Sequence, residues 1–172
     1  MKLVIFFISL QASEIVDKRI NKTEIQIMDL KIKQVDTSNE YQEVLKIRKK
    51  VFIEEQKISK KIEIDSYEKT SKYIIAFLNN RPVGTARWRK SGLEIKLERF
   101  AVLKDYRNKG IGRRLNNFIL NEIPKSKIIY LNSQESAIGF YENLGFVASG
   151  SPFKEAGILH IKMIYKNDKM KP

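Results

Sequence analysis

The residues best suited to chemistry lie in one short basic segment that contains two glycines. Arg107-Asn108-Lys109-Gly110-Ile111-Gly112-Arg113-Arg114 follows an apolar stretch and precedes apolar residues at helical spacing. The segment is therefore predicted to run from a strand through a turn into the start of a helix. Unpaired N–H groups and the positive end of the helix dipole meet at such a start. Because glycine lets an anion approach the main chain closely, the segment predicts a phosphate or diphosphate site.

The glycine spacing differs from that of two common phosphate-binding loops. A P-loop requires Gly-x-x-x-x-Gly-Lys followed by Ser or Thr, and a dinucleotide-binding fold requires Gly-x-Gly-x-x-Gly at the start of a βαβ unit. The pattern in this chain is Arg107-x-x-Gly110-x-Gly112, and neither of those motifs is present. Both types of loop are therefore set aside.

An α/β pattern surrounds this segment from Asp29 onward. Strands are predicted from alternating or continuous apolar residues over 30–35, 73–78, 83–88, 93–102, 128–131, 146–148 and 158–165. Helices are predicted from three- and four-residue apolar spacing over 38–52, from 111 onward and over 135–144. The polar segment 57–72 is expected to be a loop or a short surface helix. The glycine segment thus lies between a long strand and the central helix of an α/β domain.

Composition limits the class of protein and of site. The 172 residues, 42% apolar and 31% charged, are enough for one globular domain with a substantial core. Cysteine is absent, which excludes disulfides, thiolate metal sites and a cysteine nucleophile and is compatible with a cytoplasmic location. One histidine without cysteine argues against a zinc site, so no metal is predicted. The net charge of +13 favours polyanionic ligands, nucleic acid as well as an anionic cofactor.

The first 27 residues differ from the rest of the chain. Lys2 precedes an apolar run over 3–8 that is too short to cross a membrane and makes a weak signal peptide. Met28 directly precedes the first predicted strand and is a candidate natural start. We therefore expect 1–27 to be an extension that the domain does not need, 28–172 to form the domain, and no membrane partner.

Two motifs, in this order, resemble those of a known family. Val102, Tyr106 and Arg107-x-x-Gly110-x-Gly112 are similar to the acetyl-CoA signature of the GNAT N-acyltransferases. Ala137-Ile138-Gly139-Phe140-Tyr141-Glu142-Asn143-Leu144-Gly145-Phe146 is similar to the fourth motif of that family. Further segments resemble its ElaA-like subgroup, over 48–56, 84–87, 98–99, 130–134 and 153–163. The resemblance implies a GNAT fold, an α/β (α+β) domain in which helices flank a mixed, mostly antiparallel central sheet.

The cofactor that the resemblance implies is acetyl-CoA, in agreement with the charge of the glycine segment. Its pantetheine arm would pair with the strand at Phe100, Ala101 and Val102, as in strand addition. A splay between this strand and the one at Ile128 would provide the slot. The diphosphate would bind to Arg107, Asn108, Lys109, Gly110, Ile111, Gly112 and Arg113. Gln134, where many family members carry asparagine, would add a hydrogen bond to the cofactor.

The resemblance also suggests which residues move protons. Tyr141 matches a family tyrosine near the cofactor sulfur, and its phenol, with an ordinary pKa near 10, could protonate the departing thiolate. An acceptor amine must lose a proton before it attacks, and Glu98, on the same side of its strand as Phe100, is the candidate base. The alternatives are a core position for Tyr141 and an ion pair with Arg87 or Arg99 for Glu98.

Five residues are candidates for the acceptor end of the site: Arg48, Glu55, Gln56, Arg99 and His160. The first three come from the region that would cover the acceptor in the family's fold. The single histidine lies in a segment that matches the ElaA-like subgroup. The competing interpretation is a solvated helix face or loop for the first group and a structural role for His160.

The expected reaction is transfer of an acetyl group from acetyl-CoA to an amine by direct attack in a ternary complex, because no cysteine is present to form an acyl-enzyme. The acceptor is left open between a small-molecule amine, a protein N-terminus and a lysine. The alternatives are a transferase that uses another acyl-CoA, a CoA-binding regulator without catalysis, and a nucleic-acid binder. A homodimer is expected from family habit alone.

Overall fold

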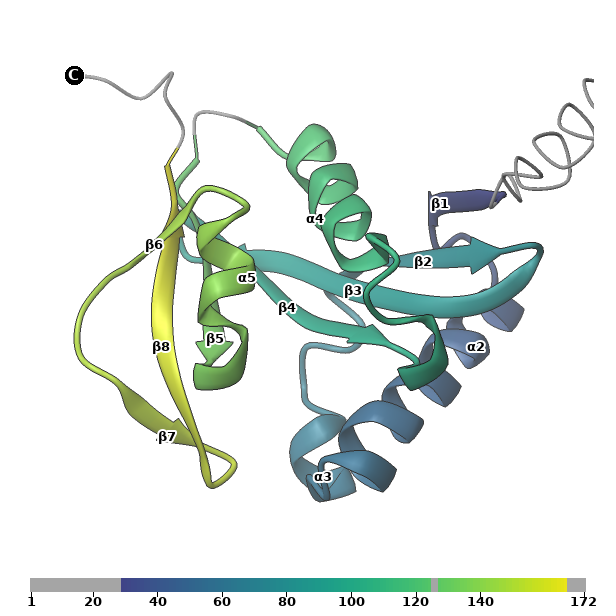
Figure 1. Cartoon of the computed structure of the whole chain (residues 1–172), viewed down its shortest axis with the longest axis horizontal. Helices are drawn as coiled ribbons and strands as arrows, with labels where there is room; N and C mark the ends of the chain where they lie inside the picture. Colours follow the sequence, from purple (N-terminus) through teal and green to yellow (C-terminus); the bar gives the residue numbers. More distant parts are fainter. Residues whose placement is uncertain (1–28, 125–126, 167–172) are drawn as a thin grey trace, which may run out of the picture.

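One mixed sheet is the frame of the molecule. The computed structural model describes residues 29–124 and 127–166, so the prediction for residues 1–27 lies outside this part of the chain. Within these residues eight strands form one sheet in the order β1-β2-β3-β4-β5-β8-β6, with β7 paired to β8 (Figure 1). Every pairing is antiparallel except that of β4 with β5. This confirms the predicted mixed, mostly antiparallel sheet.

The strands and helices follow the predicted order. The strands are β1 (Leu30–Gln34), β2 (Lys72–Leu78), β3 (Arg81–Ser91), β4 (Glu94–Val102), β5 (Ile129–Gln134), β6 (Phe146–Ala148), β7 (Phe153–Glu155) and β8 (Ile158–Tyr165). The helices are α2 (Ser38–Arg48), α3 (Lys60–Glu63), α4 (Ile111–Glu122) and α5 (Ile138–Glu142). A π-helix, η1 (Lys49–Glu55), and two 3-10 turns, η2 (Lys104–Tyr106) and η3 (Glu135–Ala137), complete them. Among the described residues, no helix has the length and apolar character needed to cross a membrane.

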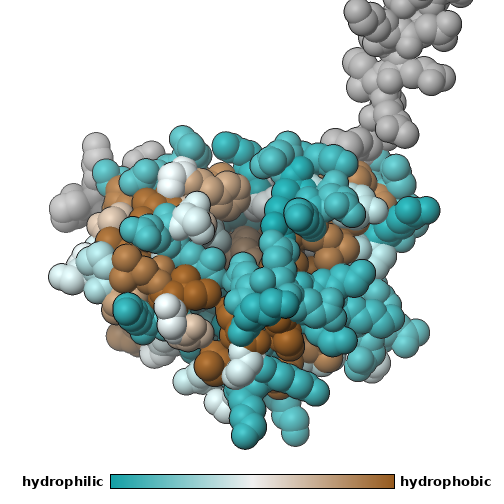
Figure 2. Space-filling model, turned by 60° about the horizontal axis from the view of Figure 1, so that its bottom comes forward, coloured by the Kyte–Doolittle hydropathy of each residue, from teal (hydrophilic) through white to brown (hydrophobic). Residues whose placement is uncertain are grey.

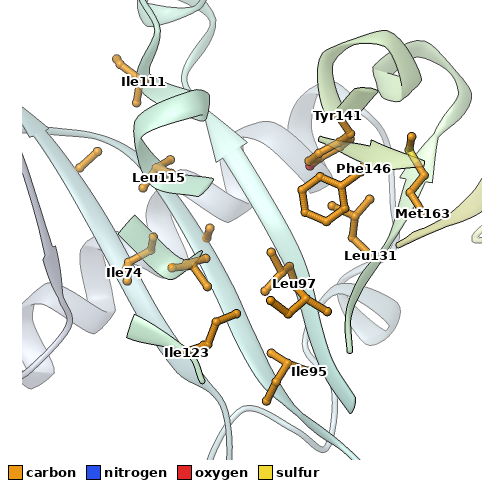
Figure 3. Packing of buried hydrophobic residues seen from close by; sticks show 14 of the residues in the cluster. Ile74, Ile95, Leu97, Ile111, Leu115, Ile123, Leu131, Tyr141, Phe146 and Met163 are labelled. Carbon is orange, nitrogen blue, oxygen red and sulfur yellow. The ribbon is translucent and has the colours of Figure 1, made fainter. Parts of the chain in front are cut away.

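Helices cover both faces of the sheet because its central strands are apolar on both faces. In β2, Ile74 lies in the cluster that packs under α4 and α5, whereas its neighbour Ile75 packs in the cluster of Val44 from α2. This alternation is the two-residue period of a strand. Figure 3 shows the larger cluster, in which Leu115 of α4 and Tyr141 of α5 meet side chains of the sheet. The packing of α4 on the sheet fixes the position of the start of α4 relative to β4.

Two predicted helices are divided in the structure. The helix predicted over 38–52 is α2, whose N-cap is Thr37, followed by the π-helix η1. The helix predicted over 135–144 is the 3-10 turn η3 followed by the five-residue α5. The strand β7 was not predicted, because its three residues show no clear alternation. In the structure η1 contacts β4 and η3 contacts β5, so the two lie on either side of the separation between these strands.

The strands β4 and β5 separate in the middle of the sheet. They pair only through Ile95 with Ile129, Lys96 with Tyr130 and Leu97 with Leu131. Two residues later, Arg99 has a φ of 57°, a left-handed conformation that interrupts the extended strand. The pairing of β3 with β4 is irregular over the same stretch. Beyond Leu97 the edge of β4 that faces β5 therefore has no strand partner among the described residues, as the predicted splay requires.

Candidate active site

A cavity of about 510 Å³ opens where β4 and β5 separate. Side chains from β4, η1, α3, β5, α5 and the β7–β8 turn line it. The structure brings together ten of the predicted site residues in this lining: Gln56, Glu98, Arg99, Phe100, Ala101, Val102, Arg107, Gln134, Tyr141 and His160. Figure 2 views the molecule from the side of α3 and β7, where apolar surface emerges between hydrophilic residues. Residues far apart in the sequence therefore share one hollow.

The glycine segment turns the chain directly into α4. Asn108 and Gly110 have positive φ values of 61° and 75°, and Gly110 is the N-cap residue. No side chain among the described residues caps this helix start, so the N–H groups of its first turn lack an intrahelical acceptor. A Cβ added at Gly110 would meet nothing within 4 Å. The start of α4 is thus open, and Lys109 and Arg113 are exposed beside it.

The second glycine of the motif has a different role from the first. A Cβ at Gly112 would lie 3.1 Å from Cζ of Phe140. Gly112 therefore permits the close approach of α4 to the aromatic side chain that precedes Tyr141. The prediction that both glycines clear space for a phosphate fits Gly110, whereas Gly112 serves the contact between the two motifs.

Arg107 lies between the glycine segment and the cavity. Its Nε donates to the carbonyl of Val102 at 3.0 Å, and its two terminal nitrogens donate to the carboxylate of Glu55. Hydrogen bonds from Arg107 lower the pKa of Glu55, and the same contact raises the pKa of Arg107. Glu55, predicted at the acceptor end, thus lies beside the glycine segment, and it is not part of the cavity lining.

Tyr141 presents its hydroxyl to the cavity from an apolar surrounding. The side chain is 8% exposed, and its ring makes edge contacts with Phe100, Phe140 and Phe146 at centroid distances of 5.9, 5.0 and 5.8 Å. Figure 3 shows Tyr141 beside Phe146. Burial raises the pKa of this phenol well above its ordinary value of 10.0. No hydrogen bond to another described residue involves the hydroxyl. The group therefore keeps its proton at neutral pH and can act as a proton donor.

Glu98 lines the cavity and is surrounded by cations. Its carboxylate lies 2.8 Å from Nη2 of Arg87, 2.8 Å from Nε of Arg89 and 3.3 Å from Nζ of Lys96. The ion pair with Arg87, one of the two predicted alternatives, is present. Both carboxylate oxygens thus have cationic partners, and the role of Glu98 as a base stays a prediction.

Buried arginines hold the segment 62–68 against the sheet. Arg48 is fully buried, pairs with Glu63 and Glu68, and does not reach the cavity. Arg87, equally buried, pairs with Asp65 and Glu68 as well as with Glu98. Sequence reasoning proposed Arg48 for the acceptor, but the structure assigns it to this internal network.

Arg99 and two glutamines also line the cavity. Arg99 donates to the main-chain oxygens of Ile62 and Glu63 and lies 3.1 Å from Oδ2 of Asp65. Nε2 of Gln134 donates to Oε1 of Gln56 at 3.0 Å. This bond links the end of β5 to the residue that follows η1, so it joins two walls of the cavity.

His160 and Glu155 line the cavity from β8 and β7, and Asn132 lines it from β5; the sequence reasoning missed Glu155 and Asn132. Nδ1 of His160 lies 2.8 Å from the carbonyl of Ile158, and the ring stacks on Phe153. Glu155 and Asn132 also belong to the lining and are hydrogen-bonded to each other. The signals for Glu155 were its place in the segment 153–163, which resembles the ElaA-like subgroup, and its proximity in sequence to the single histidine.

Known proteins share this fold over most of the chain. A family model described as "Acetyltransferase (GNAT) domain" matches residues 34–167. The uncharacterized protein YyaT of Bacillus subtilis is 40% identical over 140 residues, which cover 78% of this chain and 94% of that protein. The uncharacterized N-acetyltransferase YjcF of the same organism is 34% identical, with coverages of 77% and 99%.

Solved structures give the same result. The crystal structure of Escherichia coli ElaA has a TM-score of 0.72 and 25% identity, and it covers 80% of this chain and 99% of that one. An aminoglycoside 6'-N-acetyltransferase complexed with coenzyme A has a TM-score of 0.65 and 18% identity, with coverages of 83% and 99%. From the family match, these relatives and the shared architecture, the chain belongs to the GNAT acetyltransferase family.

Proposed function

We propose that this protein transfers an acetyl group from acetyl-CoA to an amine by direct attack in a ternary complex. Family membership supports acyl transfer from CoA to an amine. The observation that carries the finer proposal is the open, uncapped start of α4 next to the unpaired edge of β4. A cofactor with its diphosphate at the start of α4 and its pantetheine arm along the edge of β4 would reach into the cavity that Tyr141 lines.

The residues present fit such a cofactor. N–H groups at the start of α4, from Gly110 to Arg113, and the side chains of Arg107 and Lys109 would hold the diphosphate. Main-chain groups of β4 over 100–102 would pair with the amides of the arm. A structural neighbour of this chain is complexed with coenzyme A, which supports CoA as the ligand. Acetyl-CoA supplies the activated thioester, and the protein supplies position and protons.

The cavity supplies the proton donor and the space for the acceptor. Tyr141 carries its proton at neutral pH, as a phenol ordinarily does, and would donate it to the departing thiolate sulfur. Glu98 would take the proton of the attacking amine, directly or through water. Gln56, Arg99 and His160 border the part of the cavity that the acceptor would enter. Orientation of the two substrates would contribute most of the rate.

The test uses Gly110→Glu, with Gly92→Glu as a matched control. Both glycines have positive φ, and neither has atoms within 4 Å of an added Cβ, so both variants carry the same backbone strain, of about 1 kcal/mol. Gly92 lies in the β3–β4 turn, outside the site. By calorimetry, Gly110→Glu is expected to lose CoA binding because a carboxylate occupies the diphosphate position, while Gly92→Glu binds like the wild type. Unchanged affinity in Gly110→Glu would refute the assignment.

Turnover is tested by thiol release from acetyl-CoA with a panel of polyamines, aminoglycosides, amino acids and peptide N-termini. Thermal-shift comparison of acetyl-CoA with longer acyl-CoAs identifies the preferred donor. Binding of CoA with no thiol release for any amine would contradict an enzyme and favour a CoA-binding regulator. The same assays therefore separate the proposal from a transferase that uses another acyl-CoA and from a CoA-binding regulator.

A further inference from the structure

Three glutamates line the cavity, and one of them lacks a cationic partner among the described residues. Glu63 and Glu98 are each paired with buried arginines. Glu155 makes no salt bridge within the described part of the chain and accepts one hydrogen bond, from Nδ2 of Asn132 to Oε2 at 3.2 Å. A glutamate is ordinarily ionised at neutral pH. Glu155 therefore brings to the lining a negative charge that no neighbouring arginine or lysine neutralises.

A tight hairpin fixes the position of Glu155. It is the last residue of β7 and pairs with Ile158 of β8. The two residues between them, Ala156 and Gly157, have φ values of 52° and 79°. Two successive positive φ values define the two-residue hairpin turn whose twist matches that of the strands. The carboxylate is thus presented by a regular hairpin at the edge of the cavity.

Asn132, on β5, orients this carboxylate by a hydrogen bond. It follows Leu131, the last residue of β5 that pairs with β4, so it lies where the two strands begin to separate. Its amide holds Oε2 of Glu155, while Oε1 has no hydrogen-bond partner in the described residues. Gln134, two residues further on the same side of β5, is bonded to Gln56 instead. One oriented carboxylate oxygen therefore remains free to accept hydrogen bonds.

The arginine and lysine side chains of the lining do not neutralise Glu155, since they are bonded to other groups. Arg99 donates to main-chain oxygens and to Asp65, and Lys96 lies beside Glu98. An incoming amine is a cation at neutral pH, because primary amines ordinarily have pKa values well above 7. A hydrogen-bonded carboxylate inside a cavity binds an ammonium through a short, charge-assisted hydrogen bond.

We infer that Glu155, oriented by Asn132, is the group that receives the acceptor's ammonium, and that the acceptor class is a cationic primary amine. This inference rests on the proposed transfer to an amine and adds a specificity-determining residue to it. Glu155 binds the amine in its protonated form, before a base removes the proton from the amine.

The experiment measures amine binding to the CoA-saturated protein by calorimetry, with spermidine, kanamycin and an alanine-ended peptide amide as probes. The variants are Glu155→Gln, which keeps the size of the side chain, and Glu122→Gln, which changes an exposed carboxylate of α4 outside the cavity. The tightest-binding probe is expected to bind Glu155→Gln about ten- to a hundredfold more weakly. Its affinity for Glu122→Gln, and the CoA affinity of both variants, should equal the wild-type values.

Two outcomes overturn the inference without touching the cofactor assignment. The first is an equal amine affinity in wild type and Glu155→Gln, and the second is the absence of binding by all three probes to a wild-type protein that binds CoA. Failure of the wild type to bind CoA would instead refute the proposed function. Thermal unfolding of Glu155→Gln shows whether the variant is folded, and Glu155→Asp, which keeps the charge, should retain part of the affinity.

Discussion

Arg107 and Glu55 form a two-pronged ion pair at the mouth of the proposed cofactor site. Nη1 and Nη2 of Arg107 lie 2.7 and 2.6 Å from Oε1 and Oε2 of Glu55. The two side chains are 36% and 41% exposed, so the pair is accessible to solvent and to ligands. A diphosphate bound at the start of α4 would need the same guanidinium edge. Glu55 and the proposed cofactor would therefore compete for Arg107.

Removal of the competing charge should strengthen cofactor binding. Glu55→Gln is expected to bind CoA up to about fivefold more tightly, because an exposed pair contributes at most about 1 kcal/mol. Glu54→Gln is the control, since Glu54 pairs with Lys49 at 3.1 Å on the same helix. Calorimetry with CoA measures both. Weaker binding by Glu55→Gln would mean that Glu55 positions Arg107 for the ligand instead of competing with it.

Tyr141→Phe should separate binding from turnover. The substitution keeps the aromatic contacts of the ring and removes the hydroxyl, so CoA affinity should be unchanged while kcat falls about a hundredfold. Because burial raises the pKa of Tyr141 above 10.0, the wild-type enzyme should show no loss of kcat from this group between pH 7 and pH 9. Tyr130→Phe, which removes a hydroxyl bonded to Ser91, is the control. Equal kcat values for Tyr141→Phe and the wild type would exclude the acid role.

Acid should destabilise the fold through Glu68. Burial favours the protonated form of this carboxyl, but hydrogen bonds from Arg48, Tyr41 and Tyr73 outweigh burial and lower its pKa from 4.5 to about 2. The folded state thus holds the ionised form more strongly than the unfolded chain does. This contribution to stability is complete above about pH 4.5 and is lost as the pH falls toward 2.

The free energy of unfolding should accordingly fall by about 2 to 3 kcal/mol over that range because of Glu68. In Glu68→Gln this part of the pH dependence should disappear, and the stability at pH 7 should fall by about 3 kcal/mol because Arg48 and Arg87 lose a buried partner. Urea unfolding at several pH values measures both effects. Glu43→Gln, which breaks an exposed pair with Lys46, should cost less than about 1 kcal/mol. A pH dependence in Glu68→Gln as steep as in the wild type would show that other groups carry the acid sensitivity.

The sequence predicted the parts of the site that depend on local signals. The turn at the glycine segment, the start of α4 after it and the position of Tyr141 on a helix follow from motifs of a few residues. The order of strands and helices followed from apolar periodicity in the same way. Such signals are contained in one stretch of chain, so they survive without knowledge of the tertiary structure.

Pairings between distant residues could not be predicted in this way. Arg48 lies on a helix whose other charged residues all keep some exposure, and its spacing does not reveal that Arg48 is buried against Glu63 and Glu68. The family resemblance suggested Glu55 for the acceptor end, and nothing in the sequence near Glu55 indicates that its partner is Arg107, 52 residues away. The left-handed turn at Arg99, which opens the cavity, also has no signal in a run of strand-forming residues. These features depend on which segments the fold brings together.

Glu98→Gln and Asp65→Asn together decide whether Glu98 acts as a base. Both substitutions remove a carboxylate from Arg87, whose Nη2 lies 2.8 Å from Glu98 and 2.6 Å from Asp65. Both should therefore lower the free energy of unfolding, by about 1 to 3 kcal/mol. Of these two carboxylates, Glu98 alone lines the cavity. If Glu98 removes the amine's proton, Glu98→Gln should lower kcat about a hundredfold, and Asp65→Asn should not. Stopped-flow or steady-state thiol release with the best acceptor gives kcat for each variant. An equal loss of kcat in Asp65→Asn would mean that Glu98 acts by positioning Arg87, and a wild-type kcat in Glu98→Gln would leave it with the ion pair alone.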